Sequence, residues 1–179
     1  MPQTITLGDK NFRPYITEAQ IQEAVKKIAH QINQDYKGKC PLIVPVLNGS
    51  FMFASDLMKM LTCACHISFI KASSYKGIES TGSLAALIGI NEDITGRDII
   101  ILEDIIDTGH TLAKIIPSIQ ALGPATVKVG TLIFKPKALQ TNIQIDYTGI
   151  EISNEFIVGY GLDYDGLGRN LKEIYQVIE

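Results

Sequence analysis

The chain reads DIIILEDIIDTGHT from Asp98 to Thr111, and this stretch decides which fold the sequence predicts. It opens with four consecutive large aliphatic residues, at positions 99–102, a run that is typical of a strand buried on both faces of a parallel sheet. Two carboxylates, Glu103 and Asp104, follow directly. Because open α/β sheets bind ligands at the carboxyl ends of their strands, we expect these acids to face a ligand.

A short polar turn, from Asp107 to Thr111, leads from this strand into a predicted helix. After the turn, apolar residues recur at the spacing of one helix face: Leu112, Ile115, Ile116, Ile119 and Leu122. The turn contains Gly109, and a glycine-bearing turn before a helix presents free N–H groups that can hold a phosphate. The alternative is an ordinary helix N-cap supplied by Asp107 or Thr108. That alternative does not explain the two adjacent acids, because neighbouring carboxylates repel each other.

The composition indicates one globular domain, spanning residues 1–179. Hydrophobic residues make up 46% of the chain, and the formal net charge is −3. Proteins that bind nucleic acids or anionic membranes usually present a basic surface, so we expect neither partner. The apolar runs are too short for a membrane span, and the first residues do not resemble a signal peptide.

The chain has three cysteines, Cys40, Cys63 and Cys65. An odd number of cysteines without a secretory signal indicates reduced thiols, and therefore a cytoplasmic protein. Cys63 and Cys65 precede His66, but no second Cys/His pair lies at the spacing of a structural zinc site. We therefore expect no zinc site at this segment.

The sequence before the central stretch predicts a helix, a strand and a second helix. Thr17 and Gln20 have the spacing of a capping box. The apolar positions after this box mark one helix face: Ile21, Ala24, Val25, Ile28, Ala29 and Ile32. The strand at 41–47 contains Pro45, which lacks a ladder donor, so we expect this strand to be bulged or to border the sheet.

Two polar segments lie between these predicted elements. Residues 48–50, Asn-Gly-Ser, connect the strand to a helix at 51–61 and either bind an anion through backbone N–H groups or form a plain turn. Residues 73–82 lie between strands predicted at 66–72 and 84–90. They contain two glycines and five hydroxyl side chains, which is typical of a mobile loop or a surface hairpin.

The segments after the central stretch contain a lysine at a strand end and a second set of polar residues. Pro117 should kink the predicted helix or mark its limit. A buried strand at 126–134 is followed by Lys135, which we expect to be exposed at the same edge as Glu103, although such lysines are usually solvated turn residues.

The stretch from Glu155 to Asn170 reads EFIVGYGLDYDGLGRN. It combines an aromatic residue, acids and an arginine in a glycine-rich setting, which suits a flat heterocycle next to phosphates. The ring can stack, an acid can approach a metal, and Arg169 can bind a phosphate with two N–H groups. The alternative is a strand at 156–158 followed by a solvated turn.

The segment from Glu103 to Thr111, EDIIDTGHT, resembles the phosphoribosyl pyrophosphate (PRPP) motif of type I phosphoribosyltransferases. Its form is close to that of the hypoxanthine-guanine branch, and the stretch FIVGYGLDY with the later RNL resembles the purine-binding hood of that branch. Four motifs occur in the family's order, from Leu47 to the C-terminus. No G-x-x-x-x-G-K-[ST] loop occurs, which argues against an ATPase.

This resemblance implies an α/β fold, with a mainly parallel twisted sheet flanked by helices and a small hood formed from terminal segments. It also implies transfer of the 5-phosphoribosyl group from PRPP to hypoxanthine or guanine, with Mg²⁺ as cofactor. Asp107 would be the general base near purine N7. The implied PRPP and nucleotide contacts are Leu47, Asn48, Gly49, Glu103, Asp104, Asp107, Thr108, Gly109, His110, Thr111 and Arg169.

The resemblance further implies how the base and the metal are held. Lys135 would contact the 6-oxo group, Phe156 would stack on the purine, and the main-chain carbonyls of Ile157 and Asp163 would accept from a 2-amino group. The implied metal contacts are Glu103, Asp104 and Asp163. Ser74 and Tyr75 would form a closing lid. Many members of the family carry Lys where Asn48 stands, so we expect a backbone contact at that position.

Two other functions remain open at this point. One is a phosphoribosyltransferase for another base, such as xanthine or a pyrimidine. The other is a PRPP-sensing regulator that binds nucleic acid on the same fold, which should show a basic face or an added DNA-binding unit. We expect a homo-oligomer, a dimer or a tetramer, whose partners are otherwise only PRPP and a 6-oxopurine.

Overall fold

The computed structural model describes residues 4–72, 87–90 and 92–178. The predicted lid residues Ser74 and Tyr75 lie outside these ranges, as does the whole predicted loop at 73–82. Among the described residues, no helix combines the length and the apolar character that crossing a membrane requires.

A parallel sheet forms the centre of the molecule, in the order β6-β5-β3-β7-β8-β9. Its strands are β3 (Leu42–Leu47), β5 (Ile70–Ala72), β6 (Leu87–Ile88), β7 (Asp98–Ile106), β8 (Thr126–Phe134) and β9 (Tyr147–Glu151), with β4 (His66–Ile67) also pairing with β3. All pairs are parallel except that of β6 with β5. The predicted parallel sheet is confirmed, although the strand predicted at 66–72 is divided into two.

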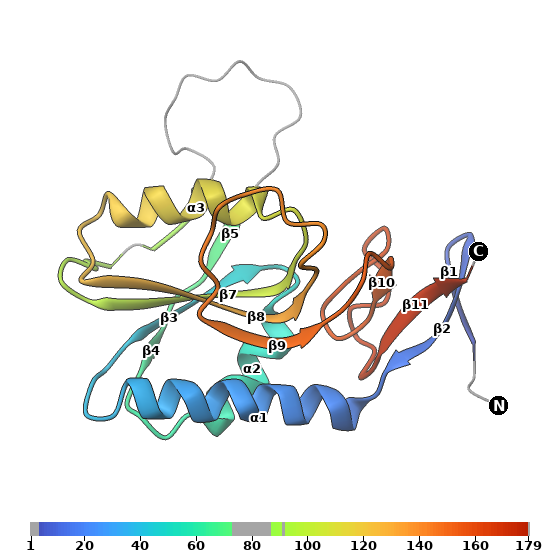
Figure 1. Cartoon of the computed structure of the whole chain (residues 1–179), viewed down its shortest axis with the longest axis horizontal. Coiled ribbons are helices and arrows are strands. Elements are labelled where there is room, and N and C mark those ends of the chain that lie inside the picture. Colours follow the sequence, from blue (N-terminus) through green and yellow to red (C-terminus); the bar gives the residue numbers. More distant parts are fainter. Residues whose placement is uncertain (1–3, 73–86, 91, 179) are drawn as a thin grey trace, which may run out of the picture.

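The strand β7 occupies the middle of the sheet because its residues are apolar on both faces. Residues 99–102 are fully buried. Ile99 and Ile101 pack on the face covered by α3 (His110–Gln120), whereas Ile100 and Leu102 pack on the face covered by α1 (Glu18–Asp35) and α2 (Phe51–Met60). Figure 1 shows this three-layer arrangement, with the sheet between α3 and α1.

The strand β3 is internal, so the expectation drawn from Pro45 is wrong. Pro45 pairs in register with Leu102 of β7, without a bulge. On the other side of β3, β4 pairs with residues 42 and 43, and β5 pairs with residues 46 and 47. The missing N–H of Pro45 is therefore accommodated by an interruption of the neighbouring strand, and β3 itself stays regular.

The helix termini show which of the predicted caps form. The capping box of Thr17 and Gln20 begins α1, as predicted. By contrast, α3 has Gly109 as its N-cap residue, with a left-handed φ of 81° and no side-chain cap, so neither Asp107 nor Thr108 supplies the N-cap. The same helix continues past Pro117 to Gln120. Asp107 is thus not explained as a cap.

A second, antiparallel sheet forms the hood, in the order β1-β2-β11-β10. It combines β1 (Ile5–Leu7) and β2 (Lys10–Ile16) from the N-terminal segment with β10 (Ile157–Val158) and β11 (Ile174–Ile178) from the C-terminal segment. In Figure 1 the hood lies beyond the ends toward which β8 and β9 point. The predicted hood from terminal segments is confirmed, and it stands beside the carboxyl edge of the central sheet.

Candidate active site

The predicted site residues come from the carboxyl ends of β3, β7 and β8 and from the hood. The strand β7 extends to Ile106, so Glu103 and Asp104 lie within its last part and not after it. The turn after β3 lies against Asp104, and the hood turn at 159–161 lies against the turn after β3. The peptide bond between Leu47 and Asn48 is cis.

Gly49 lies between the two parts of the site. A Cβ atom on Gly49 would overlap the carboxylate of Asp104, and a Cβ atom on Gly161 would overlap the carbonyl oxygen of Gly49. Glycine is therefore required at both positions for steric reasons. These contacts place the 48–50 turn directly against Asp104 on one side and against the hood on the other.

Of the two adjacent acids, Glu103 is buried and Asp104 is partly buried. Glu103 is 7% exposed, and burial, followed by the charge of Asp104, raises its pKa well above the usual value. Burial also raises the pKa of Asp104 to about 6. Hydrogen bonds from backbone N–H groups and the charge of Arg169 act in the opposite direction, because they favour the carboxylate. Buried carboxyl groups of this kind are stabilised by hydroxyl donors or a cation. The pair thus suits a ligand that brings either one.

The turn that was predicted to bind a phosphate is held in shape by the segment after β8. The Thr108 carbonyl oxygen accepts hydrogen bonds from the Gln140 N–H at 3.0 Å and the Thr141 hydroxyl at 3.3 Å. A Cβ atom on Gly109 would overlap the Thr141 hydroxyl oxygen. Because the first N–H groups of any helix lack helical acceptors, this turn offers donors at the start of α3.

His110 belongs to the same arrangement, with its Nε2 atom 3.1 Å from Oε1 of Gln140. Gln140 and Thr141 were missed by the sequence analysis. They lie some thirty residues after the turn that they hold, in a segment without regular secondary structure. No local pattern marks such a contact.

Lys135 and Asp107 form an ion pair across the ends of β8 and β7, with 2.9 Å between Nζ and Oδ2. Lys135 is 6% exposed, so the expectation that it is exposed is wrong. The Asp107 side chain is 48% exposed and can meet a ligand. The Lys135 N–H also donates to the Ile106 carbonyl oxygen at 2.9 Å, which holds the backbone of the two strand ends together.

The aromatic candidate Phe156 is available for stacking. It is 45% exposed, although Ile157 and Val158 beside it are buried. Tyr164 meets the Phe156 ring edge-to-face, with centroids 5.9 Å apart, and Phe12 lies 6.3 Å away. These neighbours orient the ring while leaving much of its surface open.

Arg169 and Asp163 are paired within the hood. Nη2 of Arg169 lies 2.6 Å from Oδ1 of Asp163, and Nη1 donates to the Gly161 carbonyl oxygen at 2.7 Å. The other Asp163 oxygen accepts from the Gly166 N–H at 2.8 Å. Both residues influence the charge state of Asp104. The hood thus brings one cation and one carboxylate toward the acids of β7.

Mg²⁺ fits this donor set only together with a ligand. In the described ranges of the chain, no three His, Cys, Asp or Glu residues lie close enough to hold a metal ion by themselves. Mg²⁺ is usually bound through one or two carboxylates plus phosphate oxygens and waters. Asp104 and Asp163 can supply such carboxylates, so the residues fit a magnesium ion that arrives with a phosphorylated substrate.

Comparison with known proteins gives consistent matches. Residues 16–165 match the phosphoribosyl transferase domain family. A hypoxanthine-guanine phosphoribosyltransferase from Streptococcus pneumoniae (strain ATCC BAA-255 / R6) is 40% identical over 160 residues, which cover 89% of each chain. The solved structure of a hypoxanthine-guanine phosphoribosyltransferase from Bacillus anthracis is 39% identical, with a TM-score of 0.84 over 92% of this chain and 96% of that chain.

Some relatives are much longer than this chain. The bifunctional protein TilS/HprT of Listeria monocytogenes serotype 4b (strain F2365) is 38% identical over 160 residues. Those residues cover 89% of this chain but only 25% of that protein, so the chain spans about a quarter of the length of this relative.

Proposed function

This chain belongs to the phosphoribosyl transferase family, and from this premise we propose that it transfers the 5-phosphoribosyl group of PRPP to hypoxanthine or guanine. The products are IMP or GMP and pyrophosphate, so the reaction serves purine salvage. The observation that carries the proposal is the ion pair of Lys135 and Asp107 at the carboxyl edge of the sheet. Relatives that are about 40% identical over most of both chains support the same activity.

The ion pair matches one edge of a 6-oxopurine. O6 and N7 are neighbours on that edge, and both are recognised together by paired polar groups. With 2.9 Å between their atoms, Lys135 can donate to O6 while Asp107 accepts the N7 proton. A 6-aminopurine presents a donor where O6 would be, which opposes the lysine. Phe156 would stack on the ring plane.

The remaining base contacts discriminate at position 2. The main-chain carbonyls of Ile157 and Asp163 accept a hydrogen bond from the 2-amino group of guanine. They would repel the 2-oxo group of xanthine, because two acceptors would face each other. The proposal therefore favours hypoxanthine and guanine over xanthine.

PRPP would bind along the carboxyl edge of the central sheet. Glu103 and Asp104 would accept hydrogen bonds from the ribose hydroxyls, which would satisfy carboxyl groups that the fold largely removes from water. The turn from Asp107 to Thr111 would hold the 5′-phosphate at the start of α3. The backbone of Leu47, Asn48 and Gly49 and the guanidinium of Arg169 would contact pyrophosphate.

Mg²⁺ held by Asp104 and Asp163 with the substrate oxygens would neutralise negative charge on the departing pyrophosphate. Glu103, beside Asp104, would be a further contact of the same ion. The chain itself would orient the ribose and the base, and would hold the leaving group through Arg169. Closure of a lid with Ser74 and Tyr75 would exclude water, whose attack on the ribose competes with the base.

The test is a set of initial rates with PRPP and Mg²⁺ against hypoxanthine, guanine, xanthine, adenine and a pyrimidine base. We expect turnover of the first two bases and release of one pyrophosphate per nucleotide. Activity with xanthine or a pyrimidine alone would change the substrate. A shift of labelled RNA or DNA without turnover of any base would indicate the regulator instead.

We further infer a homo-oligomer in a reducing compartment such as the cytoplasm. Cys40, Cys63 and Cys65 are all free thiols, which fits that compartment. Phe51 is 42% exposed at the start of α2, and Ile67 and Phe69 are 39% and 43% exposed in and after β4. These side chains would become buried if their surfaces form a subunit interface. Light scattering after gel filtration tests for a dimer or a tetramer.

A further inference from the structure

The hood turn at 159–161 contacts the part of the molecule around the central sheet at two points. The Tyr160 hydroxyl donates to Oδ2 of Asp56 in α2 at 2.6 Å, and the Tyr160 side chain is buried, with 2% of the residue exposed. One residue further on, Gly161 lies so close to the Gly49 carbonyl oxygen that any side chain would overlap it. The turn therefore contacts both α2 and the 48–50 turn that precedes this helix.

Asp56 is well placed to hold Tyr160, because its own position is determined by other groups. Oδ2 of Asp56 accepts a second hydrogen bond from Gln22 of α1 at 2.8 Å, and Oδ1 pairs with Lys59 at 2.7 Å. Both carboxylate oxygens are thus engaged by side chains of the two helices. The Tyr160 hydroxyl is bound to a fixed acceptor and not to a mobile one.

The backbone of Tyr160 indicates that this contact matters. Tyr160 has a φ of 49°, in the left-handed region that bulky residues rarely adopt, and it stands between Gly159 and Gly161, which also have positive φ. Such a conformation persists only where surrounding contacts hold it, and it is concentrated at functional sites. The hydrogen bond to Asp56 is one of those contacts.

The position of Arg169 depends on the same turn, because hydrogen bonds join Arg169 to Gly161. The Gly161 N–H donates to the Arg169 carbonyl oxygen at 2.9 Å, and the Arg169 guanidinium donates to the Gly161 carbonyl oxygen at 2.7 Å. Phe156 and Ile157, in contrast, are held by β11, through the Val177 N–H and the pairing of Ile157 with Gln176. A shift of the turn would move Arg169 and its partner Asp163 and would disturb Gly49, but it would leave Phe156 and Ile157 in place.

We propose that Tyr160, through its hydrogen bond to Asp56, is a positioning residue for the pyrophosphate side of the active site. It sets the hood turn against Gly49 and thereby places Arg169 opposite Asp104. This inference rests on the proposed function, since it concerns the binding of PRPP and pyrophosphate. It predicts that the hydroxyl group affects these ligands much more than it affects the purine.

The first experiment replaces Tyr160→Phe, which removes only the hydroxyl. We expect the KM for PRPP, and for pyrophosphate in the reverse reaction, to rise on the order of tenfold, because a displaced Arg169 would lose a charge-assisted hydrogen bond to these ligands. The KM for hypoxanthine should stay within about twofold of the wild type, since Phe156 and Ile157 are held by β11 and hypoxanthine has no 2-amino group for the Asp163 carbonyl to bind.

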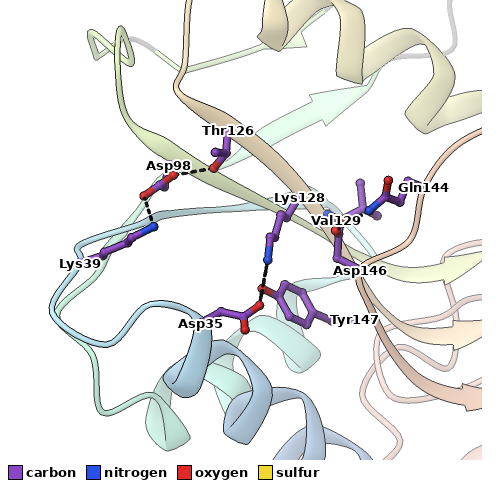
Figure 2. A network of polar contacts seen from close by, with 9 residues as sticks. All are labelled: Asp35, Lys39, Asp98, Thr126, Lys128, Val129, Gln144, Asp146 and Tyr147. Carbon is purple, nitrogen blue, oxygen red and sulfur yellow. Dashed lines mark hydrogen bonds and ion pairs between the residues drawn. The ribbon is translucent and has the colours of Figure 1, made fainter.

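The chain offers a closely matched control in Tyr147→Phe. The Tyr147 hydroxyl donates to Oδ2 of Asp35 at 2.7 Å, and Lys128 pairs with Asp35 at 2.8 Å, just as Lys59 pairs with Asp56. Figure 2 shows this second network, which lies at the start of β8 and β9 and therefore at the opposite edge of the sheet from the site. This variant should lose comparable thermal stability and keep both KM values.

A second variant shows whether Tyr160 acts through Asp56. Asp56→Asn keeps the shape but removes the charge, so it should raise the KM for PRPP less than Tyr160→Phe does. The double variant should raise it no further than Tyr160→Phe alone, because both changes act on one contact. Asp56→Asn also tests the inference should Tyr160→Phe not fold.

The outcomes separate this inference from the proposed function. A wild-type protein that forms no nucleotide from PRPP and any base overturns both. An active wild type, combined with a Tyr160→Phe variant that melts earlier but keeps its KM for PRPP, overturns the positioning role alone. Equal increases in the KM for PRPP and for hypoxanthine also overturn it, because they indicate a general loosening of the hood.

Discussion

At the scale of single residues, the Asp107 carboxylate is available for chemistry because α3 does not need it as a cap. Asp107→Asn should cost no helix cap, since Gly109 is the N-cap residue, and should lower the melting temperature only through the lost ion pair with buried Lys135. If Asp107 takes the purine proton, kcat should fall by roughly 10²–10⁴-fold, because an amide cannot accept a proton. Steady-state rates and thermal melts of the same preparation check both parts. A near-normal kcat would leave solvent or another group as the proton acceptor.

The partner of Asp107 governs the choice of base. Lys135→Gln replaces a donor with an amide that both donates and accepts, so discrimination between hypoxanthine and adenine should weaken. Because Lys135 is buried against Asp107, the variant should also lose some stability. Ratios of kcat/KM for the two bases measure the change. Unaltered ratios would remove Lys135 from the base site.

At the scale of elements, the turn before α3 combines a left-handed backbone with a crowded position. Gly109 has a φ of 81° and lies against Thr141, whereas Gly38 has a φ of 74° with open space around it. Gly109→Ala and Gly38→Ala should both lose on the order of 1 kcal/mol of stability from the backbone conformation.

These two alanine variants should differ in ligand binding. Only Gly109→Ala should raise the KM for PRPP, because the added Cβ displaces the turn from Thr141 and changes the direction of its N–H groups. Thermal melts and PRPP saturation curves test the pair. Equal KM values in both variants would remove this turn from the phosphate site.

At the scale of the whole molecule, the network of Figure 2 joins the end of α1 to the starts of β8 and β9. Asp35 accepts from Lys128 and Tyr147, which lie 93 and 112 residues further along the chain. The hydrogen bond from Lys128, followed by that from Tyr147, lowers the pKa of Asp35 below its ordinary value of 3.8. The network therefore stabilises the fold through a charged carboxylate.

This network predicts a particular dependence of stability on pH. A lowered folded-state pKa means that the stabilisation is present above the ordinary pKa and is lost as pH falls through the folded-state value. Asp35→Asn should thus melt earlier than the wild type at neutral pH, and the two melting temperatures should converge as pH falls through the folded-state pKa, which lies below 3.8. The loss should be modest, because the Asp35 side chain is 44% exposed. A gap that persists at low pH would assign the effect to packing.

The sequence alone determined the elements whose signals are local. Strand β7 was predictable from its unbroken aliphatic run, and α1 from its capping box and helical spacing, because burial of one face imposes a period on the sequence. The turn after β7 was predictable as a candidate phosphate site from residue types alone. The hood, in contrast, was suggested by resemblance, since β1, β2 and β11 are short and carry no comparable pattern.

Only the tertiary structure decided which of these residues meet. Asp107 and Lys135 are 28 residues apart, and Asp56 and Tyr160 are 104 residues apart. Gly49 is required as glycine because Asp104 and Gly161 approach it from different segments. Such contacts depend on how the strand ends and the hood pack together. A contact between residues that are far apart in the sequence produces no periodic pattern around either residue. For the same physical reason, the sequence of β3 did not show that Pro45 would face the gap between β4 and β5.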